Sequence, residues 1–130
     1  MQKILIVEPD KVLASTYSAF LLKNGFEVFC SHNAQDAMLK VDQYKPDLII
    51  LELRLISNSG VELLREIRSY PDLNYIKIII LSMIKINNLS NNWFRIKDDF
   101  DISEFLYKPE TTLSELLNIV NQIVVKNVTS

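Results

Sequence analysis

The sequence has few glycines, a single cysteine and no run of basic residues. Its two glycines form no glycine-rich loop, which argues against a dinucleotide or Walker-type nucleotide site. The single cysteine, Cys30, has no second thiol for a disulfide within the chain and no CxxC spacing for zinc. The formal net charge is −2, so we expect no nucleic-acid binding by this domain.

Long hydrophobic runs are also missing. The longest apolar stretches, at residues 48–51 and 78–81, are far shorter than the roughly 20 residues of a membrane-spanning helix. The apolar run near the start ends at Glu8 and is too short for a secretory signal. We therefore expect a cytoplasmic protein that makes no membrane contact. The length of 130 residues suits one domain, which we place at residues 1–125, followed by a frayed tail at 126–130.

Short apolar runs alternate with segments of helical periodicity. The runs predict strands at residues 4–7, 27–30, 48–51, 78–81 and 105–107. Continuous branched runs are typical of strands buried on both faces of a parallel sheet. The helical segments follow capping residues, which are Asp10, Asn33, Ser59 and Thr112. This alternation predicts an α/β fold, a doubly wound five-stranded parallel sheet with helices on both faces.

Polar residues stand at the carboxyl ends of the predicted strands, where ligands bind in sheets of this kind. Glu8 and Asp10 follow the first strand, Glu52 follows the third, Ser82 ends the fourth and Lys108 follows the fifth. We expect them to converge on one cleft. Carboxylates suit Mg²⁺, and a lysine would balance the acids or hold a phosphoryl oxygen.

Four segments together resemble the receiver domain of bacterial two-component response regulators. They are residues 3–10, 45–53, 60–68 and 105–109, and the resemblance extends over nearly the whole chain. It implies a flavodoxin-like fold with strand order 2-1-3-4-5. It also implies a signalling module of a phosphorelay, and not an enzyme.

Glu52 stands where the family has its phosphoacceptor aspartate. The extra methylene moves the carboxylate outward, and a displacement of about 1 Å can slow an in-line attack about 10²-fold. Glu52 either imitates the phosphorylated state weakly and permanently or leaves the site silent.

Two functions follow from the resemblance and its departure at Glu52. The first is a degenerate receiver (pseudo-receiver) that acts through protein–protein interaction. The alternative is a Mg²⁺-dependent phosphoacceptor that a histidine kinase still phosphorylates. A small-ligand binder of flavodoxin-like fold fits the sheet but not Ser82 and Lys108.

Pro9 is a second departure, because it replaces one of the paired acids that follow the family's first strand. The resemblance implies Mg²⁺, but the site is weakened to Glu8 and Glu52, with Asp10 as a third, weak ligand. We favour Asp10 as the N-cap of the first helix, with a contact to the metal through water as the alternative. Ile56 is a third departure, since the family has a proline in this loop.

Two positions that the family uses to switch between its states carry residues of the family's usual type. Ser82 matches the family's hydroxyl residue that hydrogen-bonds the phosphoryl group, and Phe105 matches the aromatic side chain that follows this hydroxyl inward. The alternatives are a serine bonded to nearby backbone and an ordinary core aromatic. We expect Lys108 to form an ion pair with Glu52 or Glu8, and the resemblance implies a cis Lys108–Pro109 bond.

The segment 83–108 is the face that the resemblance assigns to protein partners, either a histidine kinase or a downstream effector. Its asparagines favour only a short helix, near residues 93–97. Trp93 is either core cover, which we favour slightly, or a docking residue of the kind enriched at interfaces. The only histidine, His32, lies in a polar turn, where we expect contact with solvent.

Overall fold

The computed structural model describes residues 2–55, 59–85 and 92–128, apart from the side chains of residues 92–94 and 125–128. Strands and helices alternate along these residues. They are β1 (Lys3–Val7), α1 (Lys11–Lys23), β2 (Glu27–Ser31), α2 (Ala34–Tyr44), β3 (Leu48–Leu51), α3 (Gly60–Arg68), β4 (Lys77–Ser82), α4 (Asn92–Phe100), β5 (Glu104–Tyr107) and α5 (Leu113–Val128). Two 3-10 turns, η1 (Pro71–Leu73) and η3 (Lys108–Glu110), lie before β4 and after β5.

The strands form one parallel sheet in the order β2-β1-β3-β4-β5, so the predicted fold and strand order are confirmed. The register pairs Val7 with Leu51, Leu51 with Ile80, and Ser82 with Tyr107. The last residues of β1 and β3 are therefore neighbours, as are those of β4 and β5, and β4 extends two residues past the partner of Leu51. Every residue that directly follows a strand emerges at this one carboxyl edge.

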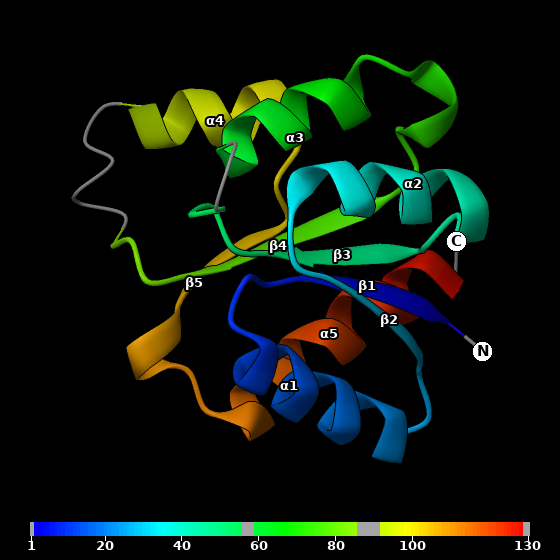
Figure 1. Ribbon diagram of the computed structural model, residues 1–130, viewed down its shortest axis with the longest axis vertical. Helices are drawn as coiled ribbons and strands as arrows, with labels where there is room; N and C mark the ends of the chain where they lie inside the picture. Colours follow the sequence, from blue (N-terminus) through cyan, green and yellow to red (C-terminus); the bar gives the residue numbers. More distant parts are fainter. Residues whose placement is uncertain (1, 56–58, 86–91, 129–130) are drawn as a thin grey trace.

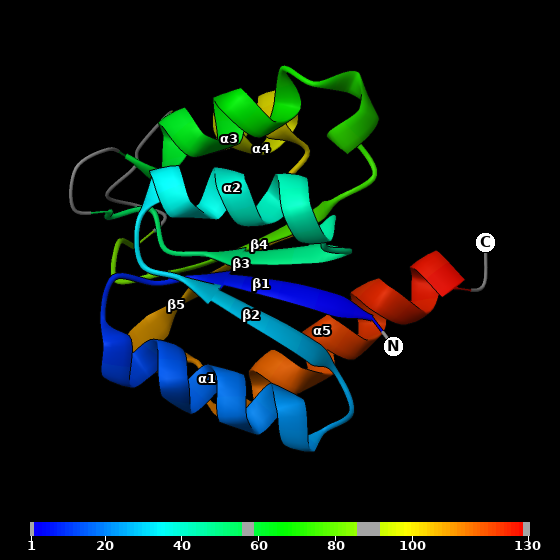
Figure 2. The ribbon, with the colours of Figure 1, turned by 45° about the vertical axis from the view of Figure 1, so that its right-hand side comes forward.

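Helices cover both faces of the sheet, as the continuous apolar runs predict. α1 and α5 lie on one face, and α2, α3 and α4 lie on the other (Figures 1 and 2). In β1, Ile4 and Ile6 pack in the cluster under α1 and α5, whereas Leu5 and Val7 pack in the opposite cluster. Both faces of the strand are buried, which is why its sequence does not alternate between apolar and polar residues. No helix of the described residues is long and apolar enough to span a membrane.

The predicted helix caps are formed. Asp10 accepts hydrogen bonds from the N–H groups of Val12 and Leu13. The remaining side-chain caps at α2, α3 and α5 come from Asn33, Ser59 and Thr112. Each cap satisfies an N–H group that has no partner inside the first turn of its helix. The capping side chains therefore determine where these helices begin.

α4 is longer than the helix predicted near residues 93–97, because it extends from Asn92 to Phe100. Ile96 and Phe100 pack against the core, and burial of such a face outweighs the low helix propensity of the sequence. The chain turns at Asp101, whose φ of 51° is left-handed. At the other end of the chain, α5 reaches Val128, and the proposed division at residue 125 stays a prediction.

Arg68, in the last turn of α3, joins three elements through its guanidinium group. Its Nε atom donates to the carbonyl of Phe100 at 2.8 Å, and Nη2 donates to the carbonyl of Ile76 at 2.8 Å. Further hydrogen bonds reach the carbonyls of Leu73, Asn74 and Asp101. Burial lowers the pKa of Arg68, and the charge of Asp101 opposes this shift. The guanidinium thereby holds the end of α4 against α3 and the start of β4.

We expect Arg68→Ala to lower the free energy of unfolding by about 2 kcal/mol, because it leaves partly buried carbonyls without a donor. Urea denaturation measures this change. Arg65→Ala removes an exposed arginine from the same helix and should change the free energy by less than about 0.5 kcal/mol. Equal effects of the two substitutions would contradict the role given to Arg68.

Candidate functional site

The carboxyl edge of the sheet brings together four of the polar side chains predicted from the strand ends. Glu8 and Glu52 are each 4% exposed, and Ser82 is fully buried. The Lys108 side chain enters from η3, directly after β5, and is also buried. Three charged groups therefore lie within one site that is shielded from water.

Lys108 joins the two acids. Its Nζ atom lies 2.5 Å from Oε1 of Glu8 and 2.9 Å from Oε1 of Glu52. The predicted ion pair with either acid is thus formed with both. Burial lowers the pKa of Lys108, but hydrogen bonds and charges from Glu8 and Glu52 outweigh burial and raise it overall. The lysine therefore stays charged between them.

The Lys108–Pro109 bond is trans, since the described residues contain no cis peptide bond, so the cis prediction was wrong. Pro109 lies in the first positions of η3. A proline fits there because its fixed φ suits the turn and its missing N–H is not needed. From this trans turn the Lys108 side chain reaches both acids.

The Glu52 carboxylate accepts four hydrogen bonds. Oε1 accepts from the N–H of Met83 at 3.0 Å and from Lys108. Oε2 accepts from the N–H of Arg54 at 3.1 Å and, over a short distance, from the hydroxyl of Ser82. Burial raises the pKa of Glu52, but the hydrogen bonds from Ser82, Lys108 and the two N–H groups together lower it below its ordinary value. The carboxylate is therefore ionised and fully bonded.

The two backbone donors were missed by the sequence reasoning. Arg54 lies two residues after Glu52, and Met83 lies one residue after Ser82. A backbone N–H group is the same in every residue except proline, so only the course of the backbone in three dimensions could reveal these donors. Gly60 helps to set that path, because its N–H donates to the carbonyl of Leu53 at 2.8 Å. A Cβ at Gly60 would lie 2.8 Å from the Cα atom of Leu53, too close for any other residue without a shift.

Ser82 and Phe105 occupy the predicted switch positions. The Ser82 hydroxyl donates to Glu52 and accepts from the N–H of Ile84 at 3.1 Å, so it contacts both the cleft and nearby backbone. Phe105 is 8% exposed and packs in the core cluster under α2, α3 and α4. Whether these two residues switch together stays a prediction. Ile56 and the side chain of Trp93 lie outside the described residues.

The response regulator receiver domain is the family whose model matches this chain, over residues 4–121. The chain belongs to this family. The receiver is 31% identical over 127 residues to the probable transcriptional regulator ycf29 of Pyropia yezoensis, a match that covers 97% of this chain and 54% of that protein. It therefore spans about half the length of this curated relative.

Solved structures agree with this assignment. A response regulator receiver domain protein (CheY-like) from Methanospirillum hungatei JF-1 superposes with a TM-score of 0.84 at 19% identity, over 99% of this chain and 98% of that one. A two-component response regulator from Clostridium difficile superposes with a TM-score of 0.82 at 26% identity, over 95% and 96%. The chain is thus a signalling module with the flavodoxin-like receiver fold.

Receiver domains bind Mg²⁺ beside the acceptor, but the donors in this receiver fit the ion poorly. Oε2 of Glu8 accepts from the N–H of Asp10 at 3.0 Å, and Asp10 caps α1 with its own carboxylate. The cation between Glu8 and Glu52 is the ammonium of Lys108. Across the described residues, no three His, Cys, Asp or Glu side chains are grouped to hold a metal. The assignment of Glu8, Glu52 and Asp10 as ligands stays a prediction.

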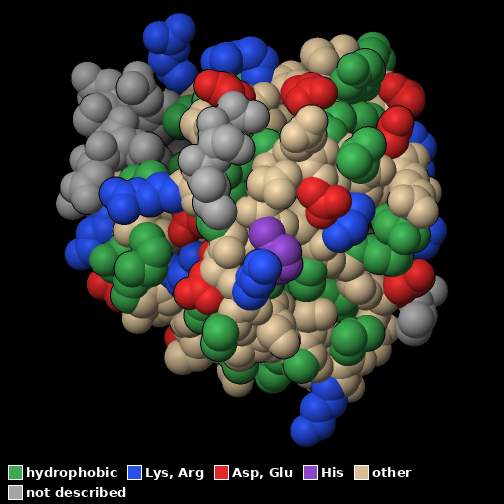
Figure 3. Space-filling view, in the orientation of Figure 1, with side chains coloured by type: hydrophobic (Ala, Val, Ile, Leu, Met, Phe, Trp, Pro, Cys, Tyr) green, Lys and Arg blue, Asp and Glu red, His purple; other side chains and the backbone are tan. Residues whose placement is uncertain are grey.

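His32 and Cys30 lie beside the receiver's site and not in it. Nδ1 of His32 lies 3.0 Å from the backbone carbonyl of Glu8, and because a carbonyl only accepts, this nitrogen is the donor. His32 is half-buried, and its ring is visible at the surface (Figure 3). Burial raises the pKa of the Cys30 thiol, so the thiol stays protonated. In the part of the chain that the structure describes, neither residue forms a hydrogen bond or ion pair with Glu52 or Lys108.

The lowered pKa of Glu52 makes the stability of the receiver depend on pH. A carboxyl group whose pKa is lower in the folded state stabilises the fold above its ordinary value, 4.5, and loses that contribution as the pH falls through the folded value. We therefore expect the free energy of unfolding to fall more steeply for wild type than for Glu52→Gln between about pH 5 and pH 3. Urea denaturation at a series of pH values measures both slopes. Glu104→Gln removes an exposed acid and should keep the wild-type slope; identical slopes for all three proteins would contradict the account of Glu52.

Proposed function

We propose that this receiver is degenerate and signals without aspartyl phosphorylation, through protein–protein interaction. The observation that supports this most strongly is the occupation of the Glu52 carboxylate by four donors. In the family, the lysine and the switch hydroxyl serve a phosphoryl group. Here both already bind an ionised glutamate side chain. Glu52 therefore takes the place of the phosphorylated residue without being phosphorylated itself.

The same contacts disfavour Glu52 as a nucleophile. An attacking oxygen needs a free lone pair and in-line access to phosphorus at about 3–3.5 Å. Each oxygen of Glu52 is bonded to two donors, and the residue is only 4% exposed. With Lys108 between the acids, the Mg²⁺ that would assist the transfer has no prepared site. The phosphoacceptor function is therefore the weaker alternative.

The imitation is partial, because a carboxylate carries one negative charge and a phosphoryl group carries about two. It still reaches the elements that the family uses for switching. The Ser82 hydroxyl is hydrogen-bonded to Glu52, and Phe105 is buried in the neighbouring strand β5. A receiver held in this way would present one surface permanently, independent of a phosphodonor.

The partner surface of this proposal is the segment 83–108, read by a histidine kinase or a downstream effector. Met83 connects the site to this surface, because its N–H binds Glu52 while its side chain is 50% exposed. Lys85 lies above the ring of Tyr107, with Nζ 5.0 Å from the ring centroid. The surface thus combines apolar, aromatic and basic groups next to the buried charges. The name of the curated relative, a transcriptional regulator, supports a regulatory output.

Intact-mass measurement after incubation with acetyl phosphate and Mg²⁺ distinguishes the two functions. We expect no added phosphoryl mass on wild type, because Glu52 is bonded on both oxygens. Glu52→Asp restores the family's acceptor residue type and shows whether the remaining site is competent. A phosphoryl mass on wild type that disappears in Glu52→Ala would establish the phosphoacceptor alternative and overturn our proposal.

Hydrogen exchange tests whether the Glu52 charge holds the partner surface. Glu52→Gln removes the charge, and a hydrogen bond to a charged group is worth about 1 kcal/mol more than a neutral one. We expect the amides of Met83 and Arg54 to exchange about fivefold faster in this variant, with faster exchange also in α4. Glu8→Gln takes the same charge from Lys108 but leaves these two amides bonded, so it is the matched control. Unchanged exchange in Glu52→Gln would rule out the imitation.

A further inference from the structure

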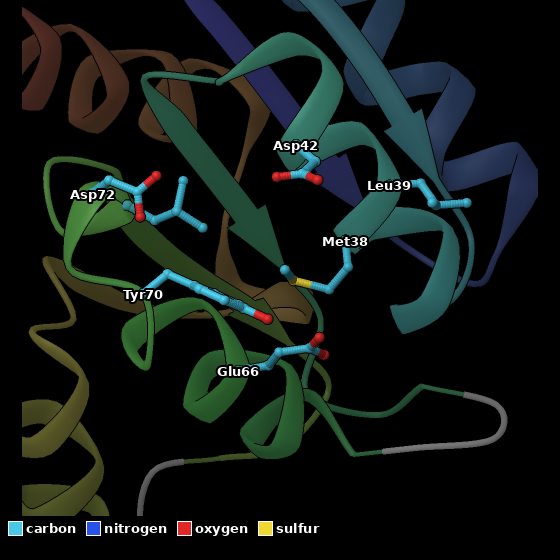
Figure 4. A pocket seen from close by; sticks show the side chains of 7 residues that line it. Met38, Leu39, Asp42, Glu66, Tyr70 and Asp72 are labelled. Carbon is cyan, nitrogen blue, oxygen red and sulfur yellow. The ribbon is translucent and has the colours of Figure 1, made fainter.

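A hollow in the surface lies between α2 and the segment that leads from α3 to β4 (Figure 4). Its volume is about 240 Å³. Tyr70 and Asp72 precede β4, and Asp42 lies near the end of α2, before β3. The cavity therefore lies toward the amino ends of these strands, whereas Glu52 lies at their carboxyl ends. It is separate from the site described above.

Carboxylates surround this cavity without matching cations. Asp42, Glu66 and Asp72 line it, and no lysine or arginine does. Among the described side chains, the one ion pair that these acids make is between Asp42 and Lys45, at 3.4 Å, and both of its partners are largely exposed. An exposed pair of this kind contributes little. The side chains that line the cavity thus carry net negative charge, and the nearby Arg68 guanidinium is already bound to the carbonyl of Leu73.

Apolar surface lies at the same place. Leu39 is 66% exposed and Tyr70 is 47% exposed, whereas Leu73, which also lines the cavity, is 2% exposed. Figure 4 shows the ends of Met38 and Tyr70 pointing toward each other, with the Glu66 carboxylate beside them. In Figure 3, acidic and hydrophobic side chains are interspersed over α2 and the turn after α3. The lining of this cavity therefore combines exposed apolar side chains with carboxylates.

We propose that this cavity binds an arginine side chain of a partner protein, with an apolar residue of the partner packed on Leu39. A guanidinium group is planar, can stack on the ring of Tyr70 and can donate to carboxylates on both sides of the cavity. The volume is smaller than the roughly 300–1,000 Å³ of pockets for small-molecule ligands, so it suits one side chain better than a cofactor. A metal is disfavoured, because the described acids form no metal-holding group.

This surface would give the receiver a second partner contact that does not depend on Glu52. Met83, at the start of the first partner surface, lies at the carboxyl edge of the sheet, and the acidic cavity lies between α2 and the segment after α3. The contact holds whether or not Glu52 is modified. A failure of one proposal therefore leaves the other standing.

Nuclear magnetic resonance titration of the labelled protein tests the proposal with two matched probes. Acetyl-leucyl-arginine amide carries the cation, and acetyl-leucyl-citrulline amide has a neutral group of nearly the same shape. We expect the arginine probe to shift the amides of α2 and of residues 66–73 and the citrulline probe to leave them unchanged. The double variant Glu66→Gln, Asp72→Asn should weaken binding of the arginine probe at least tenfold.

The matched control is Glu104→Gln, Glu110→Gln, which removes two exposed acids elsewhere and should leave binding unchanged. Three outcomes would overturn the proposal. They are the absence of shifts with the arginine probe, equal shifts with citrulline, and an equal loss of binding in the control variant. The last outcome would mean that the probe responds only to overall charge.

Discussion

A buried negative charge at Glu52 is the constraint on which the rest of the site depends. Removing a carboxylate from water costs several kcal/mol unless donors replace the lost hydration. Here the donors come from three places in the chain, the loop after β3, the end of β4 and the turn after β5. They meet because parallel strands bring their carboxyl ends to one edge of the sheet. The fold and the ionised state of Glu52 therefore support each other.

Glutamate and aspartate carry the same charge, so it is the extra methylene of Glu52 that changes the role of the site. It extends the carboxylate to the hydroxyl of Ser82 and the ammonium of Lys108, groups that in the family serve a phosphoryl group. Lys108 in turn holds Glu8, so the two acids share one buried cation. The proposed function follows because the Glu52 carboxylate occupies the donors that would otherwise bind a transferred phosphoryl group.

The two surfaces proposed for partners lie at different ends of the same sheet. Met83 and its neighbours lie at the carboxyl edge, and Tyr70 lies toward the amino ends of β3 and β4. Arg68 connects the elements between them, because it binds the end of α4 and the chain just after Tyr70. The Arg68 guanidinium therefore fixes the elements that lie between the two surfaces.

The sequence by itself determined the parallel sheet and the set of strand-end residues, because burial on both faces and helix capping depend on residue type, whereas the strand order was implied by the resemblance to receiver domains. It also indicated that Lys108 would pair with an acid. It did not reveal the N–H donors at Arg54 and Met83 or the carbonyls that bind Arg68, because backbone groups look the same in every residue. Nor did it reveal the trans bond before Pro109 or the cavity beside Tyr70. Those features were decided by tertiary structure, since each depends on where separate segments meet in space.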